Sequence, residues 1–287
     1  MKIEVLGSGG AVTVPRAFCD CRVCTQAKDN PRPPYVRHGP SVYIHDLDLL
    51  IDTPEEIRIQ LNRSGIDSVG TVLYTHWHPD HTAGIRVFEG NYTVASLLDP
   101  DKRPRRTRVV LPHRVARTFE QYHALEEKLA YLEQFGLVTI DRVAAGTPFE
   151  VHGWRITPVP LAEEIAVAYL LDEQRRVFIC MDEAFGYEPN DLGSLDLAIL
   201  PCGFFHRHPL TGEPLIAENH PVIQREPTYE DMLDVARTIG AARVIFLHLN
   251  HGLGLTPDEF EVLAGRVSQD RTLPPIEFAF DTMRITV

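Results

Sequence analysis

Short runs of β-branched, aliphatic and aromatic residues recur along the chain and are separated by polar, turn-forming residues. Such runs, bounded by glycine, proline, aspartate or asparagine, predict β-strands. The clearest are KIEVLG (2–7), SVYIHD (41–46), LLIDT (49–53), TVLYTH (71–76), RVVLP (108–112), LVTI (137–140), WRITPVP (154–160), AVAYLLD (166–172), RVFICMD (176–182), LAILPCG (197–203), ARVIFLHL (242–249) and IEFAFD (276–281). The pattern predicts a protein built largely from sheets.

Helical periodicity appears between and after these runs, at residues 116–135, 229–239 and 257–266. Thr228 and Thr256 precede the last two segments, and acidic residues follow each threonine, which is typical of helix N-caps. Many strands with helices inserted throughout favour sheets packed face to face with helices outside, an α/β (α+β) fold. No low-complexity linker divides the chain, so residues 1–287 are expected to form a single domain.

Composition and charge narrow the class of protein. The chain has 44% hydrophobic and 24% charged residues, which is ordinary for a soluble globular protein. It has no apolar run of membrane-spanning length, and MKIEVLGSGG reads as a strand and turn rather than a signal peptide, so we expect a cytoplasmic protein. The net charge of −12 argues against non-specific binding of nucleic acid, and the basic stretch 102–108 is interpreted as a solvated loop.

The stretch THWHPDHTAG concentrates candidate metal ligands directly after an apolar run. His76 and His78 are two residues apart at the end of a predicted strand, so both can point to one side of it. Pro79 ends the strand and re-aims Asp80 and His81. Two imidazoles on one side and a carboxylate with an imidazole on the other suit two metal ions side by side.

This T-H-x-H-x-D-H run resembles the signature of the metallo-β-lactamase superfamily, and further motifs follow in that superfamily's order across essentially the whole chain. The resemblance implies a four-layer αββα sandwich with metals at one edge, between the two sheets. It also implies a role for three later residues. Asp52 in LLIDTP would support the metal site from behind its ligands, Asp182 in RVFICMDE would bridge both metals, and His248 in ARVIFLHLNH would be the last histidine ligand.

One position departs from the superfamily's pattern. The segment VPLAEEIAVAYLL places Glu163 where the family usually has a histidine ligand, with Glu164 beside it. Three interpretations remain open: Glu163 is itself a ligand, Glu164 binds after a small shift of register, or the first site is weakened and holds its metal loosely. We expect Glu163 to be the ligand. An oxygen donor in place of nitrogen favours manganese or iron relative to zinc.

A second cluster lies near the N-terminus. FCDCRVCTQA spaces Cys19, Cys21 and Cys24 as C-x-C-x₂-C, a partial zinc site that lacks a fourth ligand, and His251 offers that ligand three residues after His248. The combination resembles the PhnP-type phosphodiesterases of the carbon–phosphorus lyase pathway, in which it holds a structural zinc beside two catalytic manganese ions. Proteins of the PQQ-biosynthesis B type have similar cysteines, so the cluster marks a branch of the superfamily rather than one reaction.

These residues together predict a metal-dependent hydrolase. We expect a phosphodiesterase that acts on a small phosphate ester, linear or cyclic, through a hydroxide shared by two divalent ions (Mn, Zn or Fe). The departing alkoxide needs a proton, and CGFFHRHPLTGEP supplies His206 and His208 as candidate general acids. Asp80, a metal ligand in this interpretation, is expected to be a catalytic residue together with these two histidines.

Other functions remain open from the sequence. Thioester and lactone hydrolases of the superfamily use the same hydroxide on a carbonyl carbon. RNA processing is supported only by the basic stretch 102–108, and the net charge of −12 opposes it. A metal-binding protein with a degenerate catalytic site is suggested by the missing histidine at Glu163. The expected partner is a small-molecule phosphate ester, with no nucleic acid or membrane, and a homodimer is a further expectation.

Overall fold

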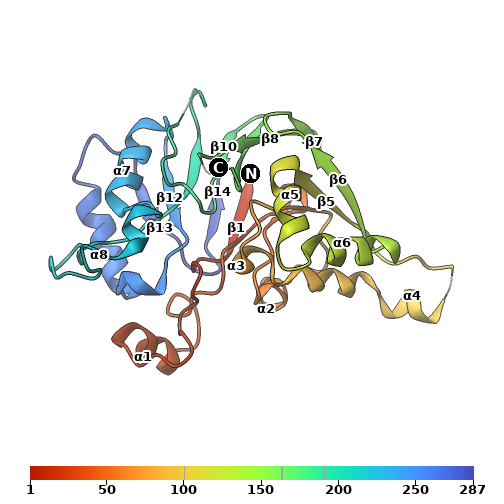
Figure 1. The fold of residues 1–287 in the computed structure, drawn as a ribbon, viewed down its shortest axis with the longest axis horizontal. Helices are drawn as coiled ribbons and strands as arrows, with labels where there is room; N and C mark the ends of the chain where they lie inside the picture. The colour runs from red at the N-terminus through yellow and green to blue at the C-terminus, as the bar shows by residue number, and fades with distance from the viewer. Residues whose placement is uncertain (100, 163, 190–191) are drawn as a thin grey trace.

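The structure is a computed structural model that describes residues 1–99, 101–162, 164–189 and 192–287. Its strands form two seven-stranded sheets (Figure 1). The first sheet has the order β14 (Arg284–Thr286), β1 (Lys2–Gly7), β2 (Ser41–Ile44), β3 (Leu49–Ile51), β4 (Thr71–Leu73), β5 (Thr107–Pro112), β6 (Val138–Val143). The second has the order β13 (Ile276–Phe278), β12 (Val244–Leu247), β11 (Leu197–Pro201), β10 (Arg176–Ile179), β9 (Val167–Asp172), β8 (Trp154–Pro160), β7 (Phe149–Val151).

Helices cover the outer face of each sheet (Figure 1). The first sheet is covered by α2 (Ile57–Ser64), α5 (His113–Gln121) and α6 (Leu125–Gln134), and the second by α7 (Tyr229–Thr238) and α8 (Pro257–Val267). The other helical elements are α1 (Arg22–Asp29), α3 (Pro79–Thr82), α4 (Val94–Leu98), and the 3₁₀ turns η1 (His45–Leu47), η2 (Ile85–Asn91), η3 (Pro221–Gln224) and η4 (His251–Leu253). None of the described helices is long and apolar enough to cross a membrane.

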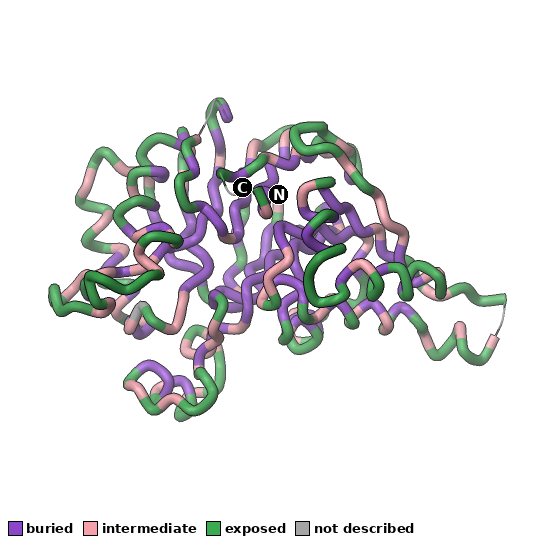
Figure 2. The backbone as a smooth tube through the Cα atoms, in the orientation of Figure 1, coloured by how far each residue is buried: buried purple, intermediate pink, exposed green. Residues whose placement is uncertain are grey.

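The alternation of side chains along β11 shows why the molecule has four layers. Leu197 and Ile199 pack in the core that includes both sheets, whereas Ala198 and Leu200 pack in the core that includes α7 and α8. Successive residues of a strand point to opposite faces, so a strand covered on both faces reads as one continuous apolar run. The predicted αββα sandwich is therefore confirmed, and Figure 2 shows the buried backbone concentrated in the two sheets.

Helix positions were predicted well with one exception. Helices α7 and α8 lie where expected, and Thr228 and Thr256 form capping boxes at their N-termini. The single helix predicted at 116–135 is wrong, because the chain forms α5 and α6 separated by a break. His123 and Ala124 adopt left-handed backbone conformations there, with φ of 56° and 52°. Neither residue is a glycine or proline, so the sequence carried no signal for the break.

A long excursion of the chain, residues 8–40, separates β1 from β2 and is called the N-terminal arm below. It extends away from the sheets and carries α1 at its far end (Figure 1). The arm packs a small apolar core of its own, built from Val14, Val23 and Ala27. Its first residues stay against the second sheet through a bridge between Gly9 and Leu249, next to His248. The arm therefore begins beside the edge where the predicted metal ligands lie.

Candidate metal centre

The predicted ligands follow the carboxyl ends of strands in both sheets. Asp52 comes directly after β3, and His76 follows its parallel neighbour β4. Asp182 follows β10 and His248 follows β12, two strands that run parallel to the β11 strand between them. Because the carboxyl ends of parallel strands meet at one edge of a sheet, the fold gathers these residues between the two sheets.

Two groups of ligand atoms form at this edge. In each group the candidate atoms all lie within 4.8 Å of one another. The first group is His76, His78, Asp182 and Glu183, and the second is Asp80, His81, Asp182 and His248. Asp182 belongs to both groups, so its carboxylate lies between them. Two adjacent donor sets that share one carboxylate suit a pair of metal ions.

The second group is the tighter one. His248 Nε2 lies 3.2 Å from Asp182 Oδ2 and 3.3 Å from Asp80 Oδ2. His81 Nε2 lies 3.3 Å from the same Asp80 oxygen and 3.9 Å from Asp182 Oδ2. Both imidazoles thus direct their Nε2 atoms toward the same two carboxylates. Imidazole nitrogen and carboxylate oxygen are donors that divalent transition metals bind.

Two buried nitrogen atoms at the centre need a partner. His76 and His81 are completely buried, and the Nε2 atom of each has no hydrogen-bond partner within the described part of the chain. An unpaired polar atom in the interior costs free energy, so a native site usually supplies a partner. A metal ion held by His76, Asp182 and their neighbours would satisfy these atoms. The residues present therefore fit a pair of divalent ions.

Asp52 fixes the orientation of His81. Its Oδ2 atom lies 2.7 Å from His81 Nδ1, and the backbone N–H and the hydroxyl of Thr75 donate to the two Asp52 oxygens at 2.8 and 2.7 Å. An Nδ1–H bonded to a carboxylate leaves the Nε2 lone pair free to bind a metal and makes it more basic. Asp52 itself is fully buried, and its backbone is left-handed with φ of 62°.

The charges at the centre move the pKa values of its groups in different directions. Burial lowers the pKa of His76 well below its usual value. Burial acts in the same direction on His81, but the charges of Asp80 and Asp52 outweigh it and raise the pKa of His81 well above the usual value. Burial raises the pKa of Asp182. Metal binding must then displace protons, notably from His81.

Glu183 is the residue that the sequence interpretation missed. His78 Nδ1 lies 3.0 Å from Glu183 Oε1, which places a second carboxylate in the first donor group. Glu183 adopts a left-handed backbone conformation with φ of 57°, an uncommon state that often accompanies functional sites. Glu163, the predicted ligand, lies outside the described residues, and Glu164 is exposed. The adjacent acidic pair in RVFICMDE was the available signal for Glu183.

The four predicted zinc ligands come together in the N-terminal arm and η4. Cys19 Sγ and Cys21 Sγ each lie 3.3 Å from His251 Nε2, and Cys24 completes the group. Burial lowers the pKa of His251, which keeps its ring neutral and able to bind metal. Burial raises the pKa of the Cys24 thiol to about 11, so a metal must displace its proton. Three sulfurs and one nitrogen are a donor set that suits tetrahedral zinc.

The two predicted general acids lie in the loop after β11, at the same edge of the sheet. His208 is buried, and its Nδ1 atom accepts hydrogen bonds from the N–H groups of Leu210 and Thr211 at 3.3 Å. His206 has a buried Nε2 atom without a hydrogen-bond partner among the residues described. No ion pair or hydrogen bond between described residues joins either ring to the metal ligands.

Glu226 is a further acidic group near the centre that the sequence did not indicate. Burial, together with the charges of Asp182 and Glu183, raises the pKa of Glu226 to about 7. The residue is half-buried and lies just after η3. A carboxyl group that titrates near neutral pH beside a metal centre can carry a proton or respond to the charge of bound ions.

Comparison with proteins of known structure shows the same fold. The structure of a diphosphatase of the PhnP family has a TM-score of 0.70 at 24% identity, and the match covers 100% of this chain and 97% of that one. Zinc-bound PqqB from Methylobacterium extorquens has a TM-score of 0.66 at 16% identity, and the match covers 100% of both chains. At these identities the structural similarity shows a shared fold. The resemblance to PhnP-type proteins comes from the sequence motifs.

Comparison of sequences identifies the family. An octanoyltransferase from Porphyromonas gingivalis is 24% identical over 277 residues, which cover 92% of this chain and 49% of that protein, so the chain spans about half of that relative's length. The sequence profile of the β-lactamase superfamily domain matches residues 48–249, well over half of the chain and most of the predicted metal ligands. The chain therefore belongs to the metallo-β-lactamase superfamily, whose members are generally metal-dependent hydrolases.

Proposed function

We propose that the protein is a metal-dependent phosphodiesterase that hydrolyses a small phosphate ester, linear or cyclic. The observation that carries this proposal is the position of Asp182 in both donor groups. A carboxylate shared by two donor sets suits two ions placed about 3.5–4 Å apart, the spacing used by many enzymes that cleave phosphate esters. Hydrolysis would add water across one P–O bond and yield a phosphomonoester and an alcohol.

Two sets of residues would each hold one ion. His76, His78 and Glu183 would hold one ion, Asp80, His81 and His248 would hold the other, and Asp182 would bridge them. When bound, such a pair supplies a nucleophilic hydroxide at neutral pH and neutralises the charge that develops on the phosphoryl oxygens. Asp52 would keep the His81 ring in one tautomer throughout, because it accepts the Nδ1 proton of that ring.

A proton must reach the oxygen of the departing alcohol. Of the two predicted general acids, His206 is the better candidate, because its Nε2 atom has no competing partner among the described residues. His208 already uses its Nδ1 atom to accept two backbone hydrogen bonds within its own loop. A correctly placed general acid contributes roughly 10²–10⁴ in rate.

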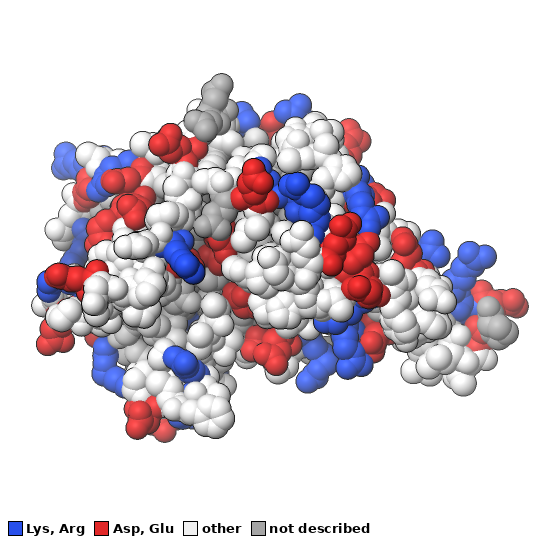
Figure 3. Space-filling view, viewed as in Figure 1, with Lys and Arg blue, Asp and Glu red and all other residues white. Residues whose placement is uncertain are grey.

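The surface supports a small substrate rather than a nucleic acid. On the face shown in Figure 3, lysine and arginine side chains are interspersed with acidic ones instead of forming a continuous basic stripe. The formal net charge of the chain is −12. Affinity for a nucleic-acid backbone depends on neutralising several phosphates at once. RNA processing is therefore the weaker alternative for this centre.

A substrate panel tests the proposal. Protein loaded with manganese, and separately with zinc or iron, would be assayed on bis(p-nitrophenyl) phosphate, a cyclic nucleotide, a phosphomonoester, a thioester and a lactone. We expect turnover of the phosphodiesters and loss of that turnover in Asp182→Ala. Hydrolysis of the thioester or lactone alone would replace the proposal with carbonyl chemistry. If no substrate is hydrolysed although metals are bound, the result would favour a metal-binding protein without hydrolase activity.

A further inference from the structure

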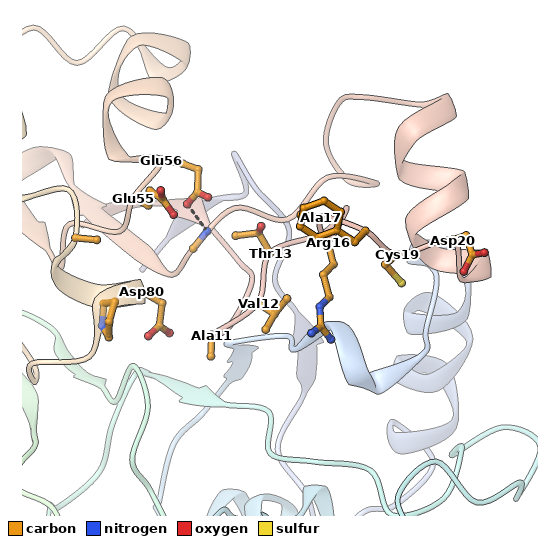
Figure 4. Close-up of a pocket in the computed structure, with 14 residues that line it drawn as sticks. Ala11, Val12, Thr13, Arg16, Ala17, Cys19, Asp20, Glu55, Glu56 and Asp80 are labelled. Atoms are coloured by element: carbon orange, nitrogen blue, oxygen red, sulfur yellow. Dashed lines mark hydrogen bonds between the residues drawn. The ribbon is translucent and has the colours of Figure 1, made fainter.

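A cavity of about 590 Å³ opens beside the predicted metal centre. Asp80, Glu55 and Glu56 line one side of it, and Arg16 and the Cys₃His end of the N-terminal arm line the other (Figure 4). Residues 11–13 lie between these two sides. The volume falls within the range that holds a small-molecule ligand. The cavity reaches Asp80, a candidate metal ligand, so a molecule bound in it would lie next to the candidate metal centre.

Phe18 stands out on the arm side of the cavity. Its ring is completely solvent-exposed, with a relative accessibility of 108%. The Cys19 N–H donates to the Arg16 carbonyl at 3.4 Å, which makes Phe18 the third residue of a tight turn, and its φ is 60°. That position in a turn favours glycine, and a bulky side chain there is strained. Neither packing nor backbone preference explains this phenylalanine.

The polar groups of the cavity complement Phe18. Arg16 lines the cavity, and its guanidinium pairs with no carboxylate among the residues that the structure describes. Glu55 and Glu56 face it from the other side, and Glu56 Oε2 also accepts the Gly39 N–H at 3.2 Å. Carboxylates only accept hydrogen bonds, so they suit the hydroxyl and amino groups of a ligand. The guanidinium suits a phosphate.

We propose that this cavity binds the nucleoside part of a nucleotide ester, with the base stacked on Phe18 and a second phosphate held by Arg16. The sugar hydroxyls would donate to Glu55 and Glu56. A planar base fits an exposed ring better than an acyl chain does, because the rest of the cavity offers charged groups and few large apolar side chains. This assignment rests on the proposed phosphodiesterase function, which it narrows to nucleotide substrates.

The cysteine cluster then has a role beyond stability. Cys19 follows Phe18 directly, and Cys19 and Cys21 both contact His251. A metal held by these residues would fix the strained turn, and with it the ring, relative to the second sheet. The base-binding wall of the cavity would thus depend on the zinc site of the arm.

Binding measurements test the assignment without requiring turnover. Manganese-loaded protein, freed of unbound metal, would be titrated calorimetrically with AMP, ribose 5-phosphate and ADP. We expect AMP to bind at least about fivefold more tightly than ribose 5-phosphate, the lower end of what one stacked base contributes. Phe18→Gly should abolish this difference without lowering the melting temperature, because glycine suits the left-handed turn. Arg16→Gln should reduce the preference for ADP over AMP.

Matched variants and a separate assay complete the test. Leu97→Ala and Arg103→Gln remove an exposed apolar and an exposed basic side chain far along the chain from the cavity, and both should bind like the wild type. Equal binding of AMP and ribose 5-phosphate by the wild type, or an unchanged AMP preference in Phe18→Gly, would overturn the assignment. If binding discriminates as expected but no phosphodiester is hydrolysed, the proposed function fails and the nucleotide site stands.

Discussion

Glu183 Oε1 lies 3.0 Å from His78 Nδ1, so a carboxylate stands beside an imidazole in the first donor group. This carboxylate comes from the residue after Asp182, which belongs to both donor groups, whereas the predicted ligand Glu163 lies outside the described residues. An oxygen donor at this position favours harder ions such as manganese or iron over zinc. This relationship makes the first ion position the part of the centre that is most open to test.

The first prediction concerns the ligands of that position. Glu183→Ala should lower the metal content of the catalytic centre by about one ion per chain, because it removes the oxygen donor beside His78. Elemental analysis after loading and desalting measures this. Glu164→Ala is the matched control, since Glu164 is exposed and should keep both ions.

Glu163→Ala separates the two assignments. If Glu163→Ala loses an ion and Glu183→Ala does not, the ligand is the one that the sequence indicated and the interpretation of Glu183 is wrong.

The second prediction concerns Asp52. Asp52→Asn should weaken metal binding by roughly 10–100-fold, because the amide cannot hold the His81 Nδ1 proton as the carboxylate does. Metal affinity would be measured by competition with a chelator. Thr75→Val removes one donor to Asp52 but leaves the carboxylate in place, and it should have a smaller effect. An Asp52→Asn protein that binds metal like the wild type would remove Asp52 from the site.

The third prediction concerns the cysteine cluster. Cys21→Ser should lose zinc while the catalytic ions remain, because the cluster shares no ligand with the centre at Asp182. Cys202→Ala is the control: this cysteine is also free and fully buried, but it lies in the core of the second sheet. Loss of all ions together in Cys21→Ser would mean that the arm and the catalytic centre fold as one unit.

The fourth prediction uses pH. The pKa of Glu226 in the folded, metal-free protein is about 7, above the usual value of 4.5. A raised pKa means that the folded state binds this proton more tightly than the unfolded state does. The resulting contribution to stability is present below about pH 4.5 and is lost as the pH rises through 7. Glu226→Gln should therefore raise the melting temperature of the metal-free protein at pH 8 and leave it unchanged at pH 4.

Metal loading provides the control for Glu226. The charges of Asp182 and Glu183 help to raise its pKa, and bound cations would offset those charges. The advantage of Glu226→Gln at pH 8 should consequently shrink in the loaded protein. An advantage of the same size with and without metal would show that Glu226 does not sense the centre.

The sequence predicted the layers and the gathering of ligands well, for a physical reason. Buried strands leave continuous apolar runs, and parallel strands bring the residues after their carboxyl ends to one edge, so His76, Asp182 and His248 meet there. The break between α5 and α6 could not be predicted from the sequence. His123 and Ala124 adopt left-handed backbone conformations there, and no glycine marks the position.

The missed features are those that depend on side-chain direction. Glu183 enters the donor group because its left-handed backbone turns it toward His78, and no periodicity reports such a turn. The same holds for Phe18, whose exposure follows from a tight turn in the arm. Alignment with a family pattern pointed to Glu163, which lies outside the described residues, so that assignment stays a prediction.

The central claim is that two ions at the shared Asp182 carboxylate hydrolyse a phosphodiester. The most direct test is a titration of catalytic metal into protein that retains its arm zinc, with the rate on bis(p-nitrophenyl) phosphate followed at each addition. We expect a rate that rises to a plateau at two equivalents per chain, and no rise in Asp182→Ala. Full loading with two equivalents and no hydrolysis, or a plateau at one equivalent, would contradict it.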